Sequence, residues 1–443
     1  MDNKEFIKYH LNDDVNKLAL SKFPEGVDKQ FVIRQIQARQ VLKKKLPSWA
    51  ENEDLLFPKR LSLEQCSSEL TAKYKSTKQH ETTRKEFGED SCDLVDEEIL
   101  VDLTGGMGVD TAFLSDNFDK TFYVEAQEEL CELARHNFRI LNKNIEVVNA
   151  KAEDFLSQCG KVYCIYLDPA RRDEYGRKMV SLHDCSPDVA ELQDILFEKT
   201  DNVLVKLSPM LDIDIVKKEL KNIKEIHVVA VKNECKELLV ACQRNTDDGQ
   251  QELETQGLKD ARTQSCEDSA TSITIFATDL REGWNFSFTE EEEDNAIPVF
   301  ADEIGKYLYE PGAACMKAAC FKLLSQKFNI KKLHRNSHLY TSEEFITGFP
   351  GRIFEVLNVV PFDKKAKKNL FETQGRKDAK TQSGEKSVTL KKASVAVRNF
   401  PLSADELRKH LGVKDGDEFY IFGTTMKDEK KALVLGIQNF RKS

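Results

Sequence analysis

The segment Val101–Thr111, Val-Asp-Leu-Thr-Gly-Gly-Met-Gly-Val-Asp-Thr, constrains the fold of this chain most strongly. It joins an apolar strand, residues 99–103, to a helix through a turn with three glycines, Gly105, Gly106 and Gly108. Glycine lets a backbone approach a ligand closely. Asp102 ends this strand, and Glu125 ends the next apolar run, where a carboxylate can bind both hydroxyl groups of a ribose. The pattern predicts a site for an adenosyl cofactor.

The spacing of the glycines indicates which adenosyl cofactor is expected. A dinucleotide site carries Gly-x-Gly-x-x-Gly, but counting from Gly105 places Met107 and Asp110 at the second and third glycines. The acidic Asp102 before the turn suits a cofactor with a cationic methionine group better than one with a pyrophosphate. An ordinary glycine-rich turn is the alternative, and it explains the glycines but not Asp102 and Glu125 together.

Length and composition indicate a globular protein of two or three domains. The chain has 443 residues, of which 40% are hydrophobic. No apolar run approaches the roughly 18 residues of a membrane span, and no secretory signal is expected, so we expect no membrane association. The eleven cysteines are odd in number and lack Cys-x-x-Cys pairs, which favours reduced thiols and a cytoplasmic location.

Charge is distributed unevenly along the chain. Residues 301–443 contain 27 Lys and Arg and 17 Asp and Glu, a net charge of +10, whereas the whole chain has a net charge of −10. Such asymmetry favours a basic module that meets a polyanion such as RNA. The alternative is that the lysines only keep this region soluble.

Hydrophobic patterns divide the chain into four regions. Residues 1–95 are expected to be helical, and 96–280 alternate strands with helices, which is typical of a parallel sheet covered on both faces. Residues 281–299 are expected to form an acidic linker or an exposed edge, and 300–443 a basic α+β domain with a helix from Ala313 to Phe328. Strands are expected at 99–103, 121–125, 145–149, 162–167, 203–207, 225–231, 237–242 and 272–277.

One internal repeat is present. The segment 254–265 recurs at 372–383 with ten of twelve positions identical, and both copies are polar. We interpret residues 246–270 as a flexible insertion and assign the repeat no chemistry.

The fourth predicted strand is followed by the residues that could carry catalysis. Asp168 lies where open α/β sheets bind ligands, and Pro169 favours an extended conformation for it. Its carboxylate could orient an incoming nucleophile, while Arg171 and Arg172 could bind a phosphate or stack on a base. Lys206, near the end of the fifth strand, is a candidate for substrate binding. The alternative is that an acid–arginine pair only fixes this loop.

Together, Asp102 to Gly108, Glu125 and Asp168-Pro169 resemble the motifs of class I S-adenosylmethionine-dependent methyltransferases, which have a Rossmann-like sheet. The wider set of motifs resembles a little-characterised bacterial group that joins such a domain to a C-terminal THUMP-like domain, an α+β fold of ferredoxin-like type. These further motifs are Asp168-Pro-Ala-Arg-Arg172, Asp184-Cys-Ser-Pro-Asp188, Val231-Lys-Asn-Glu-Cys-Lys-Glu-Leu238 and Arg398-Asn-Phe-Pro-Leu402. True THUMP domains bind RNA, so the resemblance implies an RNA partner.

The resemblance also implies roles for individual residues. The turn that faces the methionine part of the cofactor would comprise Asp102, Thr104, Gly105, Gly106 and Gly108. Glu125 would bind the ribose. The adenine would lie at Ala152, Glu153 and Asp154, where Lys151 replaces the acid that the family usually carries.

These observations predict an S-adenosylmethionine-dependent methyltransferase that acts on RNA. Asp168, Pro169 and Arg171 would be catalytic, Arg172 and Lys206 would bind substrate, and no metal site is predicted. A base nitrogen is the favoured acceptor, because Ser208 lies where C5 chemistry needs a cysteine. The alternatives are methylation of a protein or small molecule, and a non-catalytic scaffold that binds RNA or protein.

Overall fold

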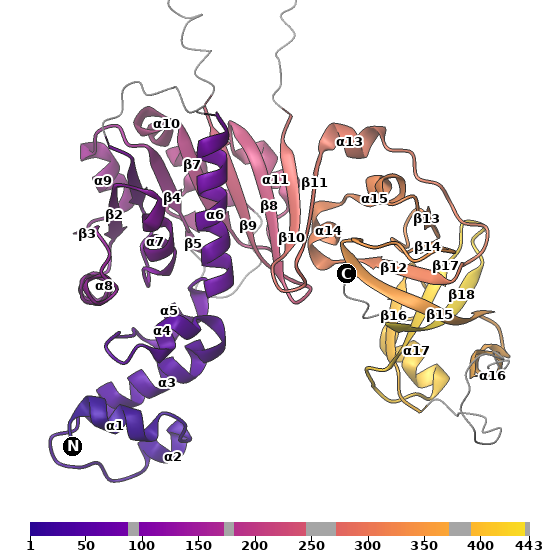
Figure 1. The fold of residues 1–443 in the computed structure, drawn as a ribbon, viewed down its shortest axis with the longest axis horizontal. Helices are drawn as coiled ribbons and strands as arrows, with labels where there is room; N and C mark the ends of the chain where they lie inside the picture. The colour runs from indigo at the N-terminus through magenta and orange to yellow at the C-terminus, as the bar shows by residue number, and fades with distance from the viewer. Residues whose placement is uncertain (87–96, 172–180, 245–271, 372–390, 439–443) are drawn as a thin grey trace, which may run out of the picture. The chain divides into compact units, whose positions relative to one another are not determined.

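A computed structural model describes residues 1–86, 97–171, 181–244, 272–371 and 391–438 (Figure 1). Contacts divide the chain into two compact units. The first comprises Met1–Ile226 and Glu237–Thr271, and the second comprises His227–Lys236 and Ser272–Ser443. The expected insertion at 246–270 and both copies of the repeat lie outside the described residues. Of the described helices, none is both long and apolar enough to cross a membrane.

The first unit begins with six helices, in the region where the sequence predicts helical structure. They are α1 (Asn3–His10), α2 (Val15–Ala19), α3 (Lys29–Lys45), α4 (Pro47–Glu51), α5 (Arg60–Gln65) and α6 (Glu69–Glu86). One buried cluster joins α3, the loop after α4 and the sheet domain, through residues such as Leu42, Phe57 and Phe138. The helices therefore share a hydrophobic core with the sheet domain.

Arg39 on α3 organises the loop that follows α4. Its guanidinium donates hydrogen bonds to the backbone carbonyls of Ala50, Asn52, Glu53 and Leu55, at 2.7–3.2 Å. The side chain is buried, and burial lowers its pKa although two nearby acids oppose the shift. Arg39 is thus a structural residue.

A nine-stranded sheet forms the centre of the methyl-transfer region predicted from the sequence. Its order is β11-β10-β8-β9-β7-β4-β1-β2-β3. The five strands from β7 to β3 are parallel, and β9 runs antiparallel to β7. The strands are β1 (Ile99–Asp102), β2 (Lys120–Glu125), β3 (Ile145–Asn149), β4 (Cys164–Leu167), β7 (Asn202–Leu207), β8 (Ile223–Val231), β9 (Glu234–Gln243), β10 (Thr274–Asp279) and β11 (Trp284–Thr289). The predicted α/β class is confirmed.

Short helices and one small ribbon connect these strands. The helices are α7 (Val109–Leu114), α8 (Glu128–Ile140), α9 (Ala152–Gln158), α10 (Val189–Lys199) and α11 (Ile213–Glu219). Strands β5 (Ala170–Arg171) and β6 (Cys185–Ser186) pair as an antiparallel ribbon after β4. Figure 1 shows α6 lying across the sheet, where Tyr74 packs on a buried cluster that includes Leu100 and Tyr166.

The second unit contains a seven-stranded sheet in the order β13-β14-β12-β15-β18-β17-β16. Its strands are β12 (Tyr307–Pro311), β13 (Lys331–Lys332), β14 (Tyr340–Ser342), β15 (Gly351–Pro361), β16 (Ser394–Arg398), β17 (Phe419–Thr425) and β18 (Lys431–Gln438). Helices α16 (Ala366–Phe371) and α17 (Ala404–Leu411) contribute to a core on this sheet. The predicted α+β architecture is confirmed.

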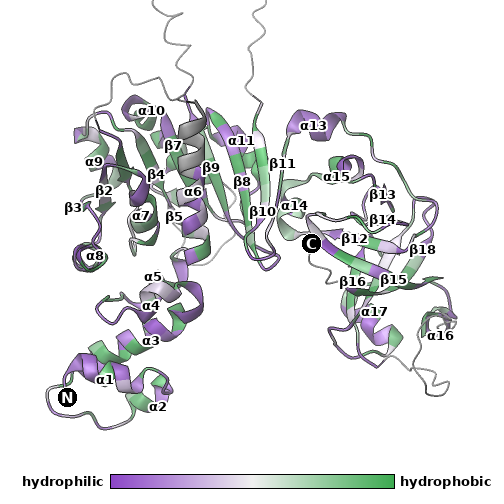
Figure 2. Cartoon of the chain, in the orientation of Figure 1, coloured by the Kyte–Doolittle hydropathy of each residue, from purple (hydrophilic) through white to green (hydrophobic). Residues whose placement is uncertain are grey.

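Two segments differ in detail from the sequence-based expectation. The expected helix from Ala313 to Phe328 is divided into α14 (Ala313–Ala318) and α15 (Phe321–Lys327), because Ala319 adopts a left-handed conformation with φ of 61°. The acidic region 281–299 contains the edge strand β11 and the helix α13 (Glu290–Asn295). Figure 2 shows the contrast between hydrophilic α13 and the hydrophobic strands β8 and β10.

Asp102, at the end of β1, holds the following turn from beneath. Its Oδ1 accepts a hydrogen bond from the backbone N–H of Thr104 at 2.9 Å, and its Oδ2 accepts one from the hydroxyl of Thr111 at 2.5 Å. The residue is only 1% exposed, and burial raises its pKa to about 7 although both hydrogen bonds oppose the shift. The two oxygens of Asp102 therefore hold the turn and the first residues of helix α7.

Replacing Arg39 by Met should destabilise the first unit by about 3 kcal/mol, because four carbonyls lose their shared donor. The measurement is the thermal unfolding midpoint of the full chain. Lys44→Met is the matched control, since Lys44 is exposed on the same helix. Equal shifts of the midpoint in the two variants would contradict the structural role of Arg39.

The stability of the first unit should fall as pH rises from about 4 to about 7. Folded Asp102 keeps its proton up to about pH 7, whereas the unfolded group ionises near 3.8, a difference worth at most about 4 kcal/mol. Above pH 7 both states are ionised and the contribution is constant. Asp102→Asn should reduce the fall in the urea midpoint between about pH 5 and pH 8. The probe is fluorescence of buried Trp49 in a Trp284→Phe background, and an unchanged pH dependence would contradict the expectation.

Candidate active site

The turn between β1 and α7 requires glycine for steric reasons. A Cβ atom on Gly105 would lie 2.2 Å from the ring of Tyr123. Gly108 has φ of 80°, and a Cβ atom there would lie 2.8 Å from the ring of Phe138. The turn can therefore pack closely over β2 and α8 only with these glycines.

Glu125, at the end of β2, fixes the same turn from its other side. Its Oε2 accepts a hydrogen bond from the backbone N–H of Gly106 at 3.0 Å, and its Oε1 accepts one from the N–H of Gln127 at 2.9 Å. Tyr123 donates its hydroxyl proton to the carbonyl of Gly106 at 2.6 Å. Glu125 is partly exposed, and each carboxylate oxygen has a further lone pair that can accept from a ribose hydroxyl.

The three residues expected near adenine begin helix α9. Ala152 is buried, whereas Glu153 and Asp154 are exposed. Asp154 borders a cavity of about 480 Å³ between α9 and the sheet, and apolar side chains such as Val101, Phe122 and Phe155 line most of it. The cavity extends to Ile99 and Val162, at the amino ends of β1 and β4, so it reaches away from the carboxyl edge where the glycine-containing turn lies. The adenine-binding roles of Ala152, Glu153 and Asp154 stay predictions.

Asp168 is joined directly to the glycine-containing turn. Its backbone N–H donates a hydrogen bond to the hydroxyl of Thr104 at 2.6 Å. Pro169 is partly exposed, and Arg171 lies in the ribbon strand β5, where it pairs with Cys185 of β6. The side chain of Arg171 and the whole of Arg172 lie outside the described parts of the chain. Their proposed roles stay predictions.

Lys206 on β7 pairs with Asp168. The Nζ atom of Lys206 lies 2.5 Å from Oδ2 of Asp168, and their strands are neighbours in the sheet. The side chain of Lys206 is 10% exposed and that of Asp168 is 34% exposed. Burial alone would lower the pKa of Lys206, but Asp168, Asp110 and Glu237 outweigh it and raise the pKa. Burial raises the pKa of Asp168, and the Lys206 ammonium opposes that shift.

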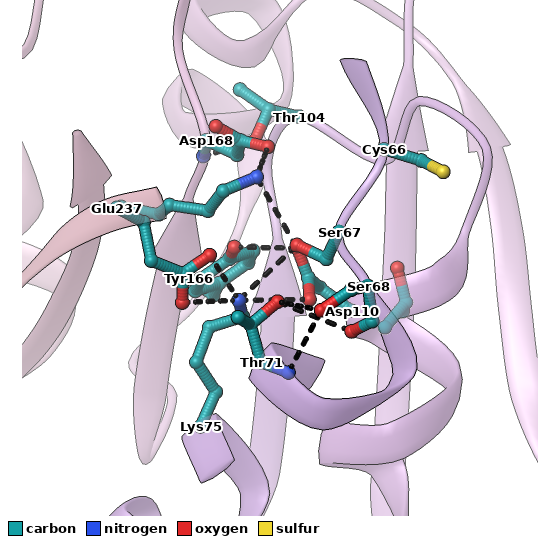
Figure 3. Close-up of polar contacts among 12 residues, drawn as sticks. Cys66, Ser67, Ser68, Thr71, Lys75, Thr104, Asp110, Tyr166, Asp168 and Glu237 are labelled. Carbon is teal, nitrogen blue, oxygen red and sulfur yellow. Dashed lines mark hydrogen bonds and ion pairs between the residues drawn. The ribbon is translucent and has the colours of Figure 1, made fainter. Parts of the chain in front are cut away.

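Behind this pair lies a buried ionic cluster that the sequence analysis did not identify (Figure 3). Lys75 of α6 donates to both carboxylate oxygens of Glu237 at 2.8 and 3.0 Å, and lies 3.2 Å from Oδ1 of Asp110. Oδ2 of Asp110 accepts hydrogen bonds from Ser67 at 2.7 Å and Tyr166 at 2.9 Å. It also lies 3.8 Å from Nζ of Lys206.

The charges in this cluster compensate one another. Burial alone would raise the pKa of Asp110, but the ammonium groups of Lys75 and Lys206 outweigh it and lower the pKa. Three carboxylates, on Asp110, Asp168 and Glu237, face these two ammonium groups. With all five groups ionised the net charge is −1, which complements a cation bound beside Asp168.

A weak sequence signal for the cluster existed. Lys206 is the one charged residue of β7 and lies near its end, and Glu237 begins the apolar run 237–242 and belongs to the motif Val231–Leu238. Asp110 occupies the place of the third glycine in a dinucleotide site. Lys75 carries no such signal, because its helix is polar on most of its surface.

A possible metal-binding group occurs elsewhere in the first unit. Of the described residues, His183, Asp188 and Glu191 present ligand atoms within 4.8 Å of one another. Nδ1 of His183 lies 2.9 Å from Oδ2 of Asp188, and this contact raises the pKa of the histidine. An ordinary ion pair accounts for the arrangement, so it carries no metal assignment.

Comparison with known proteins places the chain in a family. It is 32% identical to a Porphyromonas gingivalis W83 protein of known structure, named "putative methyltransferase", over 98% of this chain and 97% of that protein, with a TM-score of 0.77. A family model described as a ferredoxin-like domain matches residues 307–350, and one described as THUMP domain-like matches 351–436. No curated protein matches the chain.

Two further structures resemble only about a third of the chain. An rRNA methylase from Streptococcus thermophilus is 18% identical over 34% of this chain and 89% of its own, with a TM-score of 0.25. A Streptococcus mutans protein named "putative methyltransferase", whose structure was solved in complex with SAH, is 15% identical. The match covers 33% of this chain and 89% of that protein, with a TM-score of 0.26. The near-complete match to the P. gingivalis protein carries the assignment: the chain belongs to the class I methyltransferase family, in the bacterial group with a C-terminal THUMP-like domain.

Proposed function

We propose that the protein transfers a methyl group from S-adenosylmethionine to RNA. The observation that carries this proposal is the hydrogen bond from the Asp168 backbone to Thr104. It brings a carboxylate that can accept a proton to the turn expected to hold the methyl donor. Orientation of the acceptor beside the donor supplies much of the rate enhancement in such a transfer.

The residues of the first unit fit S-adenosylmethionine. The turn from Thr104 to Gly108 would bind its methionine part, Glu125 the ribose hydroxyls, and Asp154 the edge of the adenine, with Ala152 packed beneath. The excess carboxylate of the ionic cluster would stabilise the sulfonium cation. When bound, the cofactor supplies a methyl group activated by that positive charge.

The second unit supports RNA as the substrate. Its region 301–443 has a net charge of +10. Two partly exposed arginines, Arg352 and Arg398, converge on the single buried carboxylate of Glu310. Arg352 also lies 5.7 Å from the ring centroid of the partly exposed Tyr420. Guanidinium groups beside an aromatic ring suit phosphates and stacked bases.

Titration calorimetry tests the cofactor assignment. We expect S-adenosylmethionine to bind the full chain and Glu125→Ala to weaken binding by about tenfold or more, because charge-assisted hydrogen bonds are lost. The control is Glu128→Gln, an exposed acid at the start of the next helix. Absence of binding at millimolar ligand would favour a non-catalytic scaffold over an enzyme.

Salt dependence tests the RNA assignment. We expect binding of a fluorescently labelled RNA to weaken linearly with the logarithm of salt concentration, and Arg398→Gln to reduce the slope by about 0.7. Glu310 stays paired with Arg352 in this variant. Lys218→Gln in the first unit removes the same charge and should leave the slope unchanged. Failure to bind RNA would instead favour a protein or small-molecule substrate.

A further inference from the structure

The Asp168–Lys206 pair presents one hydrogen-bond acceptor and one donor at the same point. Oδ2 of Asp168 is engaged by Lys206, and the carboxylate is still 34% exposed. An ammonium group has three protons and no lone pair, so it can only donate. A ligand group that binds to both residues must therefore donate a hydrogen bond to Asp168 and accept one from Lys206.

Lys206 is held in its charged, donating form by the cluster behind it. Asp110 lies 3.8 Å from its Nζ atom, and Lys75 in turn is bound to Asp110 and Glu237. Lys75 itself has no exposed side-chain surface, so it cannot touch a substrate. We regard Lys75 as a positioning residue that acts through Asp110.

This pair matches a hydroxyl group better than a base nitrogen. A hydroxyl has one proton and two lone pairs, so it can donate to Asp168, accept from Lys206, and still direct a lone pair at the methyl donor. A ring nitrogen has one lone pair, which a hydrogen bond from Lys206 would occupy.

We propose that the methyl acceptor is the ribose 2′-hydroxyl of RNA, bound between Asp168 and Lys206. This inference rests on the proposed function, because RNA supplies the ribose. The 2′-hydroxyl is both a donor and an acceptor, and it distinguishes RNA from DNA. The base nitrogen favoured by the sequence is replaced as the expected acceptor because of the ion pair, which the sequence did not reveal.

The transfer is balanced with these groups alone. The hydroxyl oxygen forms a bond to the methyl carbon while the bond from that carbon to the sulfonium sulfur breaks, and sulfur keeps the electron pair. The hydroxyl proton passes to the carboxylate of Asp168 and from its exposed edge to water. Lys206 stays protonated and lowers the energy of the negative charge that develops on oxygen.

The test locates the transferred methyl group. The full chain is incubated with methyl-labelled S-adenosylmethionine and an unmodified transcript pool of ribosomal and transfer RNA, and the RNA is digested to nucleosides and analysed by mass spectrometry. We expect label on ribose, and no uptake by a DNA of the same sequence. Label on a base would overturn this inference and leave RNA methylation standing. No label in RNA would overturn the RNA assignment and this inference with it.

Variants test the roles of the pair. Asp168→Asn keeps the shape and an acceptor but cannot take the proton, so kcat at saturating cofactor should fall about 100-fold or more. Lys206→Met should lower kcat comparably, whereas the control Lys221→Met, an exposed lysine of the same unit, should not. Lys75→Arg should restore part of the kcat lost in Lys75→Met and return the pH profile towards that of the wild type. Full activity of Asp168→Asn would overturn the assignment. Because a fully active variant must be folded, a loss of stability could not explain that result.

Discussion

The ionic cluster at the carboxyl edge of the first sheet is the interaction on which the rest of the site depends. Lys75 and Lys206 are buried together with Asp110 and Glu237, and charges taken out of water are costly unless each is paired. Such a cluster is a poor source of stability, since apolar residues could fill the same space. Its effect is to fix the position of Asp168 through Lys206.

The cluster also joins the N-terminal helical region to the sheet domain. Helix α6 supplies Lys75, and Ser67, two residues before this helix begins, donates a hydrogen bond to Asp110. On α8, Asn137 exchanges two hydrogen bonds with the backbone of Leu56 in the loop that Arg39 organises. The helical region therefore completes the site from behind, at a depth that substrate cannot reach.

The sequence predicted the strands, the glycine-containing turn and the carboxylates at the strand ends, because each depends on local patterns. The pairing of Asp168 with Lys206 depends on neighbouring strands that are 38 residues apart in the chain, and that of Lys75 with Glu237 on residues 162 apart. No local pattern encodes these pairs. Asp102 was predicted as a carboxylate at a strand end, but its burial beneath the turn could be seen only in the tertiary structure.

The two units present opposite charges at the sites described above. In the second unit, Glu310 neutralises only one of two arginines, so positive charge is left at a partly exposed surface. In the ionic cluster of the first unit, the three carboxylates exceed the two ammonium groups by one. This charge suits a cationic methyl donor but repels a phosphate. An RNA that enters this site must therefore be held largely by contacts outside it. Under the proposed function, this requirement gives the basic second unit a physical reason to accompany an acidic site.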